Sequence, residues 1–563
     1  MVFVLVMMSG AKALIESLRM EHTEVIFGIP GGAIMPVYDV LRDSGIRHIL
    51  ARHEQCAAHM ADGYARASGK VGVCMATSGP GSTNLVTGIA TAHMDSSPVV
   101  AFTGQVARHF IGKDAFQEID IIGITANIVK HNYQVRDPRR IPPIVKAAFR
   151  IASTGRKGPV LVDLPRDVQT EIVDLTFTEE LEMIEKGPYE TFSELHIEEV
   201  VKTLKEAEKP VILAGGGVIN SDAYSELLTL AECLKAPVAT TLMGKSCIPE
   251  DHPLALGMVG MHGMPYTNLI LTEADVIFAV GCRFSDRSIA DAETFGKNSK
   301  IIHVDIDASE IGKNVDVDIA VVGDAKEVLT QILKNLKNNS QPEKTSAWLK
   351  HIEKLKQEYA LPKYEEETPI KPPKLMKELR QLLPKNAIIT TEVGQNQMWA
   401  AIYFKTYFPR TFLSSGGLGT MGFGFPAALG AKTAKPDVPV VDIAGDGSFL
   451  MNERELATSV EEKIPVIVII LDNRVLGMVA QWQRLLYKKR YSQVHLGSTP
   501  DFVKLAESYG AIGLRVESYE EFRKAIKQAL TSEVTTVIDV PISPEEDVEP
   551  IKLPRGVVSH SVG

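Results

Sequence analysis

The sequence predicts an α/β protein with three domains, each built on a mostly parallel sheet flanked by helices. Short β-branched or apolar runs of strand length recur along the 563 residues, and each is followed by a segment with helical periodicity. This pattern is typical of βα units that form parallel sheets. At roughly 150 residues per domain, the length allows about three or four domains. The ten expected strands are 25–27, 71–75, 99–103, 160–164, 211–213, 276–280, 301–306, 388–391, 438–443 and 466–471.

Two polar stretches divide these strands into three groups. Residues 179–195 are rich in Glu, and residues 335–374 contain NNSQPEK and YEEETPIKPPK, where charges and prolines replace periodic apolar residues. We therefore expect domains at 1–180, 190–340 and 365–563. No repeat of 20 to 50 residues is visible, which disfavours a solenoid.

Composition excludes several classes of protein. With 60 Lys and Arg against 70 Asp and Glu, the net charge is −10, so no nucleic-acid partner is expected. The five cysteines form no C-x-x-C pair, which argues against a disulfide framework or a zinc site and favours a cytoplasmic setting. The apolar run at 1–8 lacks a basic segment and a cleavage site, and no other run approaches the roughly 18 residues of a membrane span. We therefore expect no membrane association.

The strongest chemical signal is a Gly-Asp-Gly turn followed by an Asp-Asn pair in the third group. The sequence reads as a strand, the turn, a helix over about 452–463, a second strand and then Asp-Asn. A right-handed crossover would bring Asp446 and Asn473 together at the carboxyl ends of neighbouring strands. Their oxygens suit an octahedral Mg²⁺ that keeps positions for phosphate oxygens, and Gly445 and Gly447 allow close backbone approach. GDG alone is more often an ordinary turn, but the spacing and the second ligand favour a metal site.

These motifs carry a family resemblance. GDGSF followed by DNRVLGMV resembles the thiamine-diphosphate signature, and QWQRLLY is similar to the acetohydroxyacid (acetolactate) synthases. The likeness extends over nearly the whole chain through FGIPGGAIMPVYD, RHEQCAAHMADGYARASGK, TSGPGSTN, DAFQEID, GPVLVDLPRDV, LGMVGMHG, GQNQMWAA and SGGLGTMGFGFPAALGA. It implies a transferase that decarboxylates pyruvate and passes the two-carbon unit to a second 2-ketoacid, pyruvate or 2-ketobutyrate, in valine, leucine and isoleucine biosynthesis. The three domains would then be a pyrimidine-binding domain, an FAD-binding-type domain and a pyrophosphate- and magnesium-binding domain.

By this resemblance, Glu54 in RHEQ is the catalytic carboxyl group that hydrogen-bonds N1′ of the aminopyrimidine. Such a role requires burial and a shifted pKa. A surface ion pair with Arg52 or His53 is the alternative for a Glu in this context. Val475 would complete the metal shell of Asp446 and Asn473 through its carbonyl. The other implied thiamine diphosphate contacts are Gly32, Gly394, Gln395, Gly419, Met421, Gly447, Ser448, Gly477 and Met478.

The resemblance also implies an acceptor pocket. Arg287 would bind the carboxylate of the second 2-ketoacid, because a guanidinium fork suits a carboxylate. Trp482 would favour 2-ketobutyrate over pyruvate, a preference of about 1–3 kcal/mol for one methylene. Phe116 and Gln117 would line the same pocket, with Gln117 hydrogen-bonding a reacting oxygen. A surface arginine and a core tryptophan are the alternatives for Arg287 and Trp482.

A flavin is expected in the middle domain. Residues 417–422, GLGTMG, match G-x-G-x-x-G, but no clear strand precedes them and no acidic residue follows at the required distance, so we interpret the match as chance. The strand leading into ILAGGGVIN is the better candidate. The resemblance implies a structural FAD, since acetolactate formation needs no net electron transfer. Its contacts would be Arg156, Gly215, Gly216, Gly217, Thr241, Leu242, Met261, His262, Gly281, Arg283, Asp305, Ile306, Asp324 and Ala325.

Two further expectations follow from the family. The active site would form between two chains, so the protein would be at least a homodimer, or a dimer of dimers, and a separate regulatory small subunit is a usual partner. The rival function is a flavin oxidoreductase of the pyruvate-oxidase type. The sequence departs from the family at Ser285, Asn396, Ala107 and Asp472, where Asp, His, Pro and Asn are common.

Overall fold

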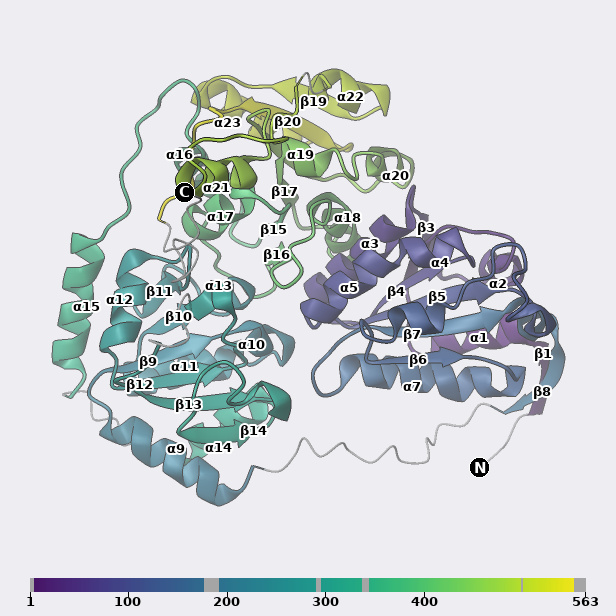
Figure 1. The fold of residues 1–563 in the computed structure, drawn as a ribbon, viewed down its shortest axis with the longest axis horizontal. Coiled ribbons are helices and arrows are strands. Elements are labelled where there is room, and N and C mark those ends of the chain that lie inside the picture. Colours follow the sequence, from purple (N-terminus) through teal and green to yellow (C-terminus); the bar gives the residue numbers. More distant parts are fainter. Residues whose placement is uncertain (1–4, 177–191, 290–294, 337–343, 498–499, 551–563) are drawn as a thin grey trace.

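In a computed structural model, which describes residues 5–176, 192–289, 295–336, 344–497 and 500–550, the chain forms three α/β units (Figure 1). Each described unit has a six-stranded sheet in which all paired strands run parallel. The predicted fold class is confirmed. Apolar side chains from the strands and from the covering helices form the cores on the sheet faces.

The N-terminal sheet has the order β3-β2-β4-β5-β7-β6. A two-stranded antiparallel pair, β1 and β8, lies beside it. The strands are β1 (Leu5–Ser9), β2 (Val25–Gly28), β3 (Arg47–Leu50), β4 (Gly72–Ala76), β5 (Val99–Gln105), β6 (His131–Gln134), β7 (Val160–Pro165) and β8 (Ile172–Thr176). The helices are α1 (Gly10–Met20), α2 (Met35–Leu41), α3 (Glu54–Ser68), α4 (Pro80–Asn84), α5 (Val86–Met94), α6 (Ile121–Thr125), α7 (Ile141–Ser153) and α8 (Arg166–Thr170).

The central sheet has the order β11-β10-β9-β12-β13-β14. Its strands are β9 (Pro210–Ala214), β10 (Val238–Thr240), β11 (Ala255–Met258), β12 (Val276–Val280), β13 (Lys300–Asp305) and β14 (Ile319–Val322). Its helices are α9 (Glu194–Glu206), α10 (Gly216–Asn220), α11 (Tyr224–Leu234), α12 (Pro265–Glu273), α13 (Asp286–Ile289), α14 (Ala325–Leu336) and α15 (Ser346–Glu358).

The C-terminal sheet has the order β16-β15-β17-β18-β20-β19. Its strands are β15 (Ile388–Thr391), β16 (Phe412–Ser414), β17 (Val440–Gly445), β18 (Ile467–Asp472), β19 (Ile512–Arg515) and β20 (Thr536–Pro541). Its helices are α16 (Pro372–Leu382), α17 (Gln395–Tyr403), α18 (Gly424–Ala434), α19 (Asp446–Phe449), α20 (Glu455–Glu461), α21 (Gly477–Leu486), α22 (Phe502–Ser508) and α23 (Tyr519–Ala529).

All ten predicted strands are present, with slightly shifted ends, but the six edge strands β3, β6, β11, β14, β16 and β19, the inner strands β10 and β20 and the pair β1 and β8 were missed. Edge strands such as β6 and β19 are half-exposed, whereas the inner strand β5 is buried at every position. A strand buried on both faces is usually a continuous apolar run, which most edge strands lack. The inner strands β10, with three residues, and β20, which carries Thr536 and Asp539, are too short or too polar to give that signal.

Three local expectations were wrong. The stretch 335–374 contains α15, whose Trp348, Ile352 and Leu355 recur at helical spacing and pack on the central core. The helix expected over 452–463 is present but shorter, as α20, because residues 452–454 form a turn; a separate short helix, α19, precedes it. A short strand, β16, does precede the GLGTMG segment. The polar stretch 179–195 lies largely outside the described residues.

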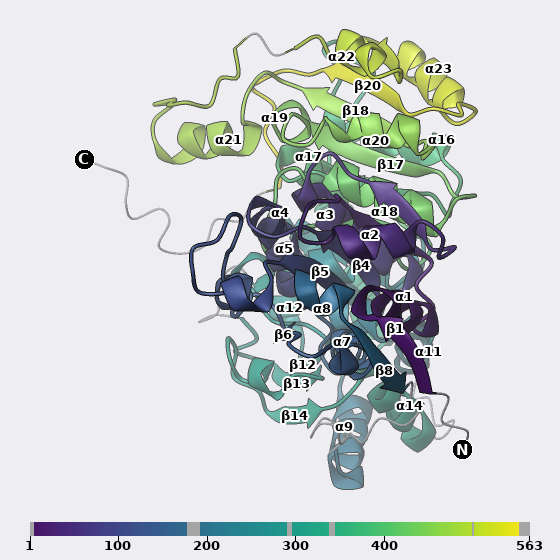
Figure 2. The ribbon, with the colours of Figure 1, turned by 90° about the vertical axis from the view of Figure 1, so that its right-hand side faces the viewer.

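The N-terminal and C-terminal units meet along α3 and α18, which lie together where the two units adjoin (Figures 1 and 2). A Cβ atom on Gly430 would lie 1.9 Å from the carbonyl oxygen of Met60, and one on Gly63 would lie 2.2 Å from that of Ala427. Real Cβ atoms do not come so close, so only glycine allows these backbones to touch. This close packing joins the first and last thirds of the chain.

Candidate active site at two sheet edges

The Gly-Asp-Gly turn and the Asp-Asn pair lie at the same edge of the C-terminal sheet. Strands β17 and β18 are parallel neighbours, Asp446 follows β17 directly, and Asn473 follows β18 directly. The Asp446 carboxylate accepts hydrogen bonds from the backbone N–H of Gly447 (2.9 Å) and of Arg474 (2.8 Å). The side chain of Asp446, one of the residues predicted from the sequence, therefore connects the two turns by hydrogen bonds.

The surroundings of Asp446 favour a cation. Asp446 is buried, and burial, reinforced by the neighbouring Asp472, raises its pKa to about 7. Asp472 pairs with the guanidinium of Arg474 at 3.0 Å. Burial also raises the pKa of Asp539, on β20, to about 6. Among the described residues no three His, Cys, Asp or Glu side chains are arranged to hold a metal, so an ion here would use Asp446 with amide and carbonyl oxygens.

Amide side chains continue this site on α17 and α21. The Asn473 side chain accepts from the N–H of Val475 (3.2 Å) and donates to Gln395 Oε1 (3.3 Å). Gln395 in turn donates to Gln481 Oε1 at 2.9 Å. A Cβ atom on Gly477 would lie 2.1 Å from Gln395 Oε1, so any other residue where α21 begins would have to displace the Gln395 side chain. Ser448 closes the turn by donating to the Gly445 carbonyl oxygen at 3.1 Å.

A cavity of about 830 Å³ lies where the three units meet: most of its lining comes from the central and C-terminal units, and the segments 94–96 and 155–157 of the N-terminal unit complete it. It is lined by the predicted acceptor residues Arg287 and Trp482 and by the predicted thiamine residues Gly394, Gly419, Met421 and Met478. The predicted flavin residues that line it are Arg156, Gly216, Gly217, Thr241, Leu242, Met261, His262, Gly281, Arg283, Asp305, Ile306, Asp324 and Ala325. Residues predicted to bind the acceptor 2-ketoacid, thiamine diphosphate and FAD therefore line one continuous cavity.

The central part of this cavity has a distinct electrostatic character. Arg156 pairs with Asp307 (3.1 Å) and Glu310 (2.7 Å), and these two ion pairs link the N-terminal unit to the central unit. Arg156 also donates to Ser96 Oγ (3.0 Å) within its own unit. Burial lowers the pKa of His262 to about 4, so this imidazole is neutral at pH 7. Arg287 pairs with Asp286 at 3.6 Å, and its side chain is 64% exposed.

The glycines after β9 have two different roles. A Cβ atom on Gly215 would lie 2.0 Å from the Gly281 carbonyl oxygen, and one on Gly217 would lie 2.6 Å from Gly281 Cα. These glycines let the loops after β9 and β12 pack together. Gly215 does not line the cavity, whereas Gly216 does.

Four predicted residues of the N-terminal unit, Glu54, Gly32, Phe116 and Gln117, do not line this cavity, whereas Arg156 of the same unit does. Glu54 begins α3 and accepts from Asn84 Nδ2 at 2.9 Å, but it is only partly buried in the single chain. Gly32 is exposed, and Phe116 is 89% exposed. Gln117 is partly buried and has a left-handed φ of 61°. One chain by itself therefore separates these residues from Arg287 and Trp482.

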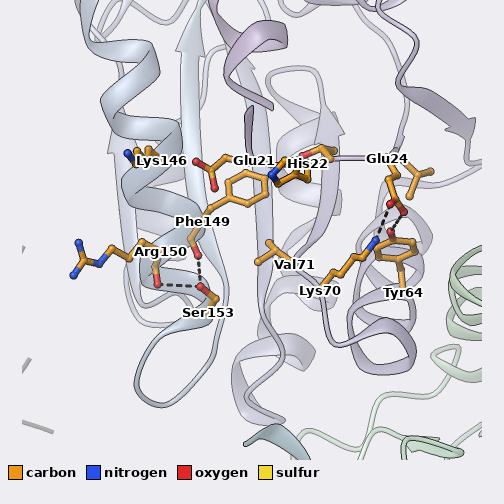
Figure 3. A pocket seen from close by; sticks show the side chains of 12 residues that line it. Glu21, His22, Glu24, Tyr64, Lys70, Val71, Lys146, Phe149, Arg150 and Ser153 are labelled. Carbon is orange, nitrogen blue, oxygen red and sulfur yellow. Dashed lines mark hydrogen bonds and ion pairs between the residues drawn. The ribbon is translucent and has the colours of Figure 1, made fainter. Parts of the chain in front are cut away.

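A second cavity, of about 770 Å³, lies at the opposite, amino edge of the N-terminal sheet (Figure 3). Glu24 in its wall accepts from Tyr64 Oη (3.0 Å) and Lys70 Nζ (2.7 Å). The charged ends of Lys146 and Arg150 point away from its centre in Figure 3. None of the predicted site residues lines this cavity.

The sequence analysis missed the residues that hold the loop carrying Gly419 and Met421. Asp95, after α5, accepts from the N–H groups of Gly416 (3.3 Å) and Gly417 (2.6 Å) and from Arg66 (3.0 Å). The contacts of Asp95 with Gly416 and Gly417 join the N-terminal and C-terminal units, and no sequence motif or spacing indicates them.

Comparison with known protein families supports the enzyme class that the fold and this site indicate. Three family descriptions match: "Thiamine pyrophosphate enzyme, N-terminal TPP binding domain" at residues 8–124, "central domain" at 197–332 and "C-terminal TPP binding domain" at 392–540. The chain is therefore of the thiamine pyrophosphate enzyme type.

Whole-chain relatives narrow the class. The chain is 54% identical to the probable acetolactate synthase large subunit of Methanocaldococcus jannaschii, over 99% of this chain and 95% of that protein. It is 46% identical to the acetolactate synthase large subunit of Corynebacterium glutamicum (97% and 88%) and 44% identical to the isozyme 3 large subunit of Escherichia coli (98% and 97%). The chain belongs to the acetolactate synthase large-subunit family. No helix within the described parts of the chain has the length and apolar character needed to cross a membrane.

Proposed function

We propose that this chain is the catalytic subunit of an acetolactate synthase, which decarboxylates pyruvate and transfers the two-carbon unit to pyruvate or 2-ketobutyrate. The observation that carries the proposal is the shared cavity. Arg287, which can bind a carboxylate, and Trp482, which offers an apolar face, line the same hollow as Met421 and Met478. The products would feed valine, leucine and isoleucine biosynthesis, in the cytoplasmic setting that the cysteine content favours.

Thiamine diphosphate and Mg²⁺ are the proposed cofactors. Thiamine diphosphate supplies a nucleophilic carbon that can stabilise the electron pair released by decarboxylation. Asp446, Asn473 and the Val475 carbonyl would hold the metal, and a divalent cation would offset the carboxyl groups gathered at this edge. Gly394, Gln395, Gly447, Ser448 and Gly477 would surround the diphosphate, and Gly419, Met421 and Met478 the rings.

The protein side chains divide the remaining work. Glu54 would share a proton with N1′ of the pyrimidine, with Gly32 offering backbone to the same ring. Arg287 would orient the acceptor carboxylate, and Gln117 would hydrogen-bond a reacting oxygen. The apolar faces of Trp482 and Phe116 would exclude water from the acceptor, so that the carbanion would add to the acceptor's carbonyl carbon and would not be protonated.

FAD is the proposed third ligand, with a structural role. Its support is the size of the cavity and the lining that all the predicted flavin residues except Gly215 provide. Arg156 and Arg283 would face the pyrophosphate, and Asp305 and Asp324 would accept hydrogen bonds from hydroxyl groups.

We also propose at least a homodimer in which the N-terminal unit of one chain completes the site of the other. Glu54, Gly32 and Phe116 do not line the cavity of their own chain, so a second chain would be needed to bring them to such a cavity. A regulatory small subunit is proposed as a further partner, since the relatives are named as large subunits.

Product identification by NMR tests the function. Purified protein is incubated with pyruvate, thiamine diphosphate, Mg²⁺ and FAD in air. We expect 2-acetolactate, with two pyruvates consumed for each CO₂. Acetate or acetyl phosphate with peroxide would instead assign the protein to the pyruvate-oxidase type.

The substitution Glu54→Gln tests the proton relay. We expect turnover to be lost while the fold and the binding of thiamine diphosphate are retained, as followed by circular dichroism and calorimetry. Full activity in this variant would refute the assignment of Glu54. Competition between pyruvate and 2-ketobutyrate in Trp482→Ala would then test the acceptor preference.

A further inference from the structure

Glu455 is a fully buried carboxylate with no part in the proposed chemistry. It begins α20 in the C-terminal unit and reaches the chain just before α3 in the N-terminal unit. Its Oε1 atom accepts from the backbone N–H groups of Arg52 (2.9 Å) and His53 (3.0 Å), and its Oε2 atom accepts from Thr458 Oγ1 (2.6 Å). Both carboxylate oxygens are therefore engaged.

The two N–H groups that Glu455 binds lie immediately before Glu54. Glu54 is the first residue of α3, and the N–H groups at a helix start have no partners within the helix. The side chain of His53 caps this helix by accepting from Gln55 N–H at 3.2 Å, and Glu455 holds the backbone of the capping residue from another domain. Thr458, one turn further along α20, donates to the Leu50 carbonyl oxygen at 3.0 Å, so α20 contacts the segment between β3 and α3 at a second point. Figure 1 shows α20 beside β3 and α3.

The segment that supplies Glu455 also carries the proposed diphosphate turn. Residues 446–458 begin with Asp446 in α19 and end in α20. Between them, the Asn452 side chain donates to the Gly422 carbonyl oxygen, next to Met421. A single short segment therefore carries the metal turn of one proposed site, contacts the loop carrying Met421, and holds the backbone of Glu54, which in the proposed dimer would serve the partner chain's cofactor.

We propose that Glu455 is a positioning residue for Glu54: it fixes the start of α3 from the C-terminal domain, and so holds Glu54 at the distance that hydrogen bonding to a pyrimidine nitrogen requires. This inference rests on the proposed function of Glu54. Displacement of a catalytic group by about 1 Å can cost 100-fold in rate, so the anchor controls proton transfer without touching the ligand.

The first test measures the anchor in protein without cofactor. Amide hydrogen exchange is followed over the segment containing Arg52 and His53 in Glu455→Ala, Glu455→Asp and Glu455→Gln. We expect faster exchange in the Ala and Asp variants, because neither side chain reaches both N–H groups. The Gln variant keeps an oxygen at the Oε1 position and is expected to remain protected. Glu461→Ala, on an exposed position of the same helix, is the matched control.

The second test measures the consequence for the cofactor. Exchange of the thiazolium C2 proton into D₂O is followed by quenched-flow NMR on the protein with bound thiamine diphosphate and Mg²⁺. We expect it to slow at least about tenfold in Glu455→Ala and Glu455→Asp, with cofactor affinity little changed, and to be close to wild type in Glu455→Gln and Glu461→Ala. The Asp variant, which keeps the charge, serves if the Ala variant does not fold.

The outcomes separate this inference from the proposed function. Unchanged C2 exchange in variants whose amides at 52 and 53 have opened would overturn the role of Glu455. Equal slowing in the Gln variant, with its amides protected, would also overturn it, because position would then not be the cause. Absence of C2 exchange in the wild-type protein, or its persistence in Glu54→Gln, would instead refute the function proposed for Glu54.

Discussion

Asp95 offers a test of how the N-terminal domain holds the proposed cofactor loop. Its carboxylate accepts from Gly417 N–H (2.6 Å), Gly416 N–H (3.3 Å) and the Arg66 guanidinium (3.0 Å), and it is buried. In Asp95→Ala, two partly buried backbone donors lose their acceptor, and Arg66 loses one charge-assisted hydrogen bond, at about 1 kcal/mol or somewhat more for each bond. Arg66 keeps its pair with Asp62 at 2.6 Å, so its charge is not orphaned. We expect a loss of about 2–4 kcal/mol in the free energy of unfolding.

Asp62→Ala is the matched control. Asp62 is also buried and accepts two hydrogen bonds from Arg66, at 2.6 and 2.9 Å, but it does not contact the loop. Its removal is expected to cost a similar amount, about 2–4 kcal/mol, since the Arg66 guanidinium then loses two charge-assisted hydrogen bonds. Only Asp95→Ala releases the loop that carries Gly419 and Met421. We therefore expect its dissociation constant for thiamine diphosphate to rise about tenfold, equivalent to 1.4 kcal/mol.

Two measurements separate the variants. Urea denaturation gives the free energy of unfolding, and isothermal titration with thiamine diphosphate and Mg²⁺ gives the affinity. If both variants lose stability and both keep wild-type affinity, the reasoning about the loop is refuted. Equal losses of affinity would refute it as well, since the effect would then follow general destabilisation.

Three further predictions concern other contacts. Gly477→Ala would place its Cβ atom 2.1 Å from Gln395 Oε1, so we expect weaker binding of thiamine diphosphate by calorimetry; unchanged affinity would show that this side chain moves freely. Burial lowers the pKa of His59 to about 4, below the usual 6.5, so the unfolded chain takes up the proton first as the pH falls. The free energy of unfolding should therefore decrease by up to about 3 kcal/mol between pH 6.5 and 4, and an equally steep decrease in His59→Gln would contradict this. Gly430→Ala, whose Cβ atom would meet the Met60 carbonyl oxygen at 1.9 Å, should lower the unfolding free energy by about 1–3 kcal/mol in urea, and a wild-type midpoint would show that α18 can shift.

Local pattern was enough to predict the class of fold and ten of the twelve inner strands of the three sheets. Strands such as β5 are buried along their whole length, so their sequence is a continuous apolar run. Edge strands such as β6 and β19 lack that signal because they are partly exposed, and the inner strands β10 and β20 lack it because they are short or carry polar residues. Helix α15 was missed for a related reason: three buried residues among many charges are a weak pattern until the central core is present.

The Asp446 and Asn473 site was predictable because its geometry follows from connectivity alone. Parallel neighbouring strands end at one edge, so residues that follow β17 and β18 must lie close together. The placement of Glu54 relative to that edge has no such rule, since it depends on how separate domains pack.

What the sequence by itself determined is therefore local: the α/β class, ten of the inner strands, and the adjacency of the turns after β17 and β18. Only the tertiary structure decided that Asp95 holds the loop of Met421, that Glu455 holds the backbone just before α3, and that Arg287 and Trp482 share a cavity. The physical reason is that a buried carboxylate needs hydrogen-bond donors, and tertiary packing decides which donors lie next to it. Those donors are backbone N–H groups, which every residue except proline carries, so no residue type marks them in advance.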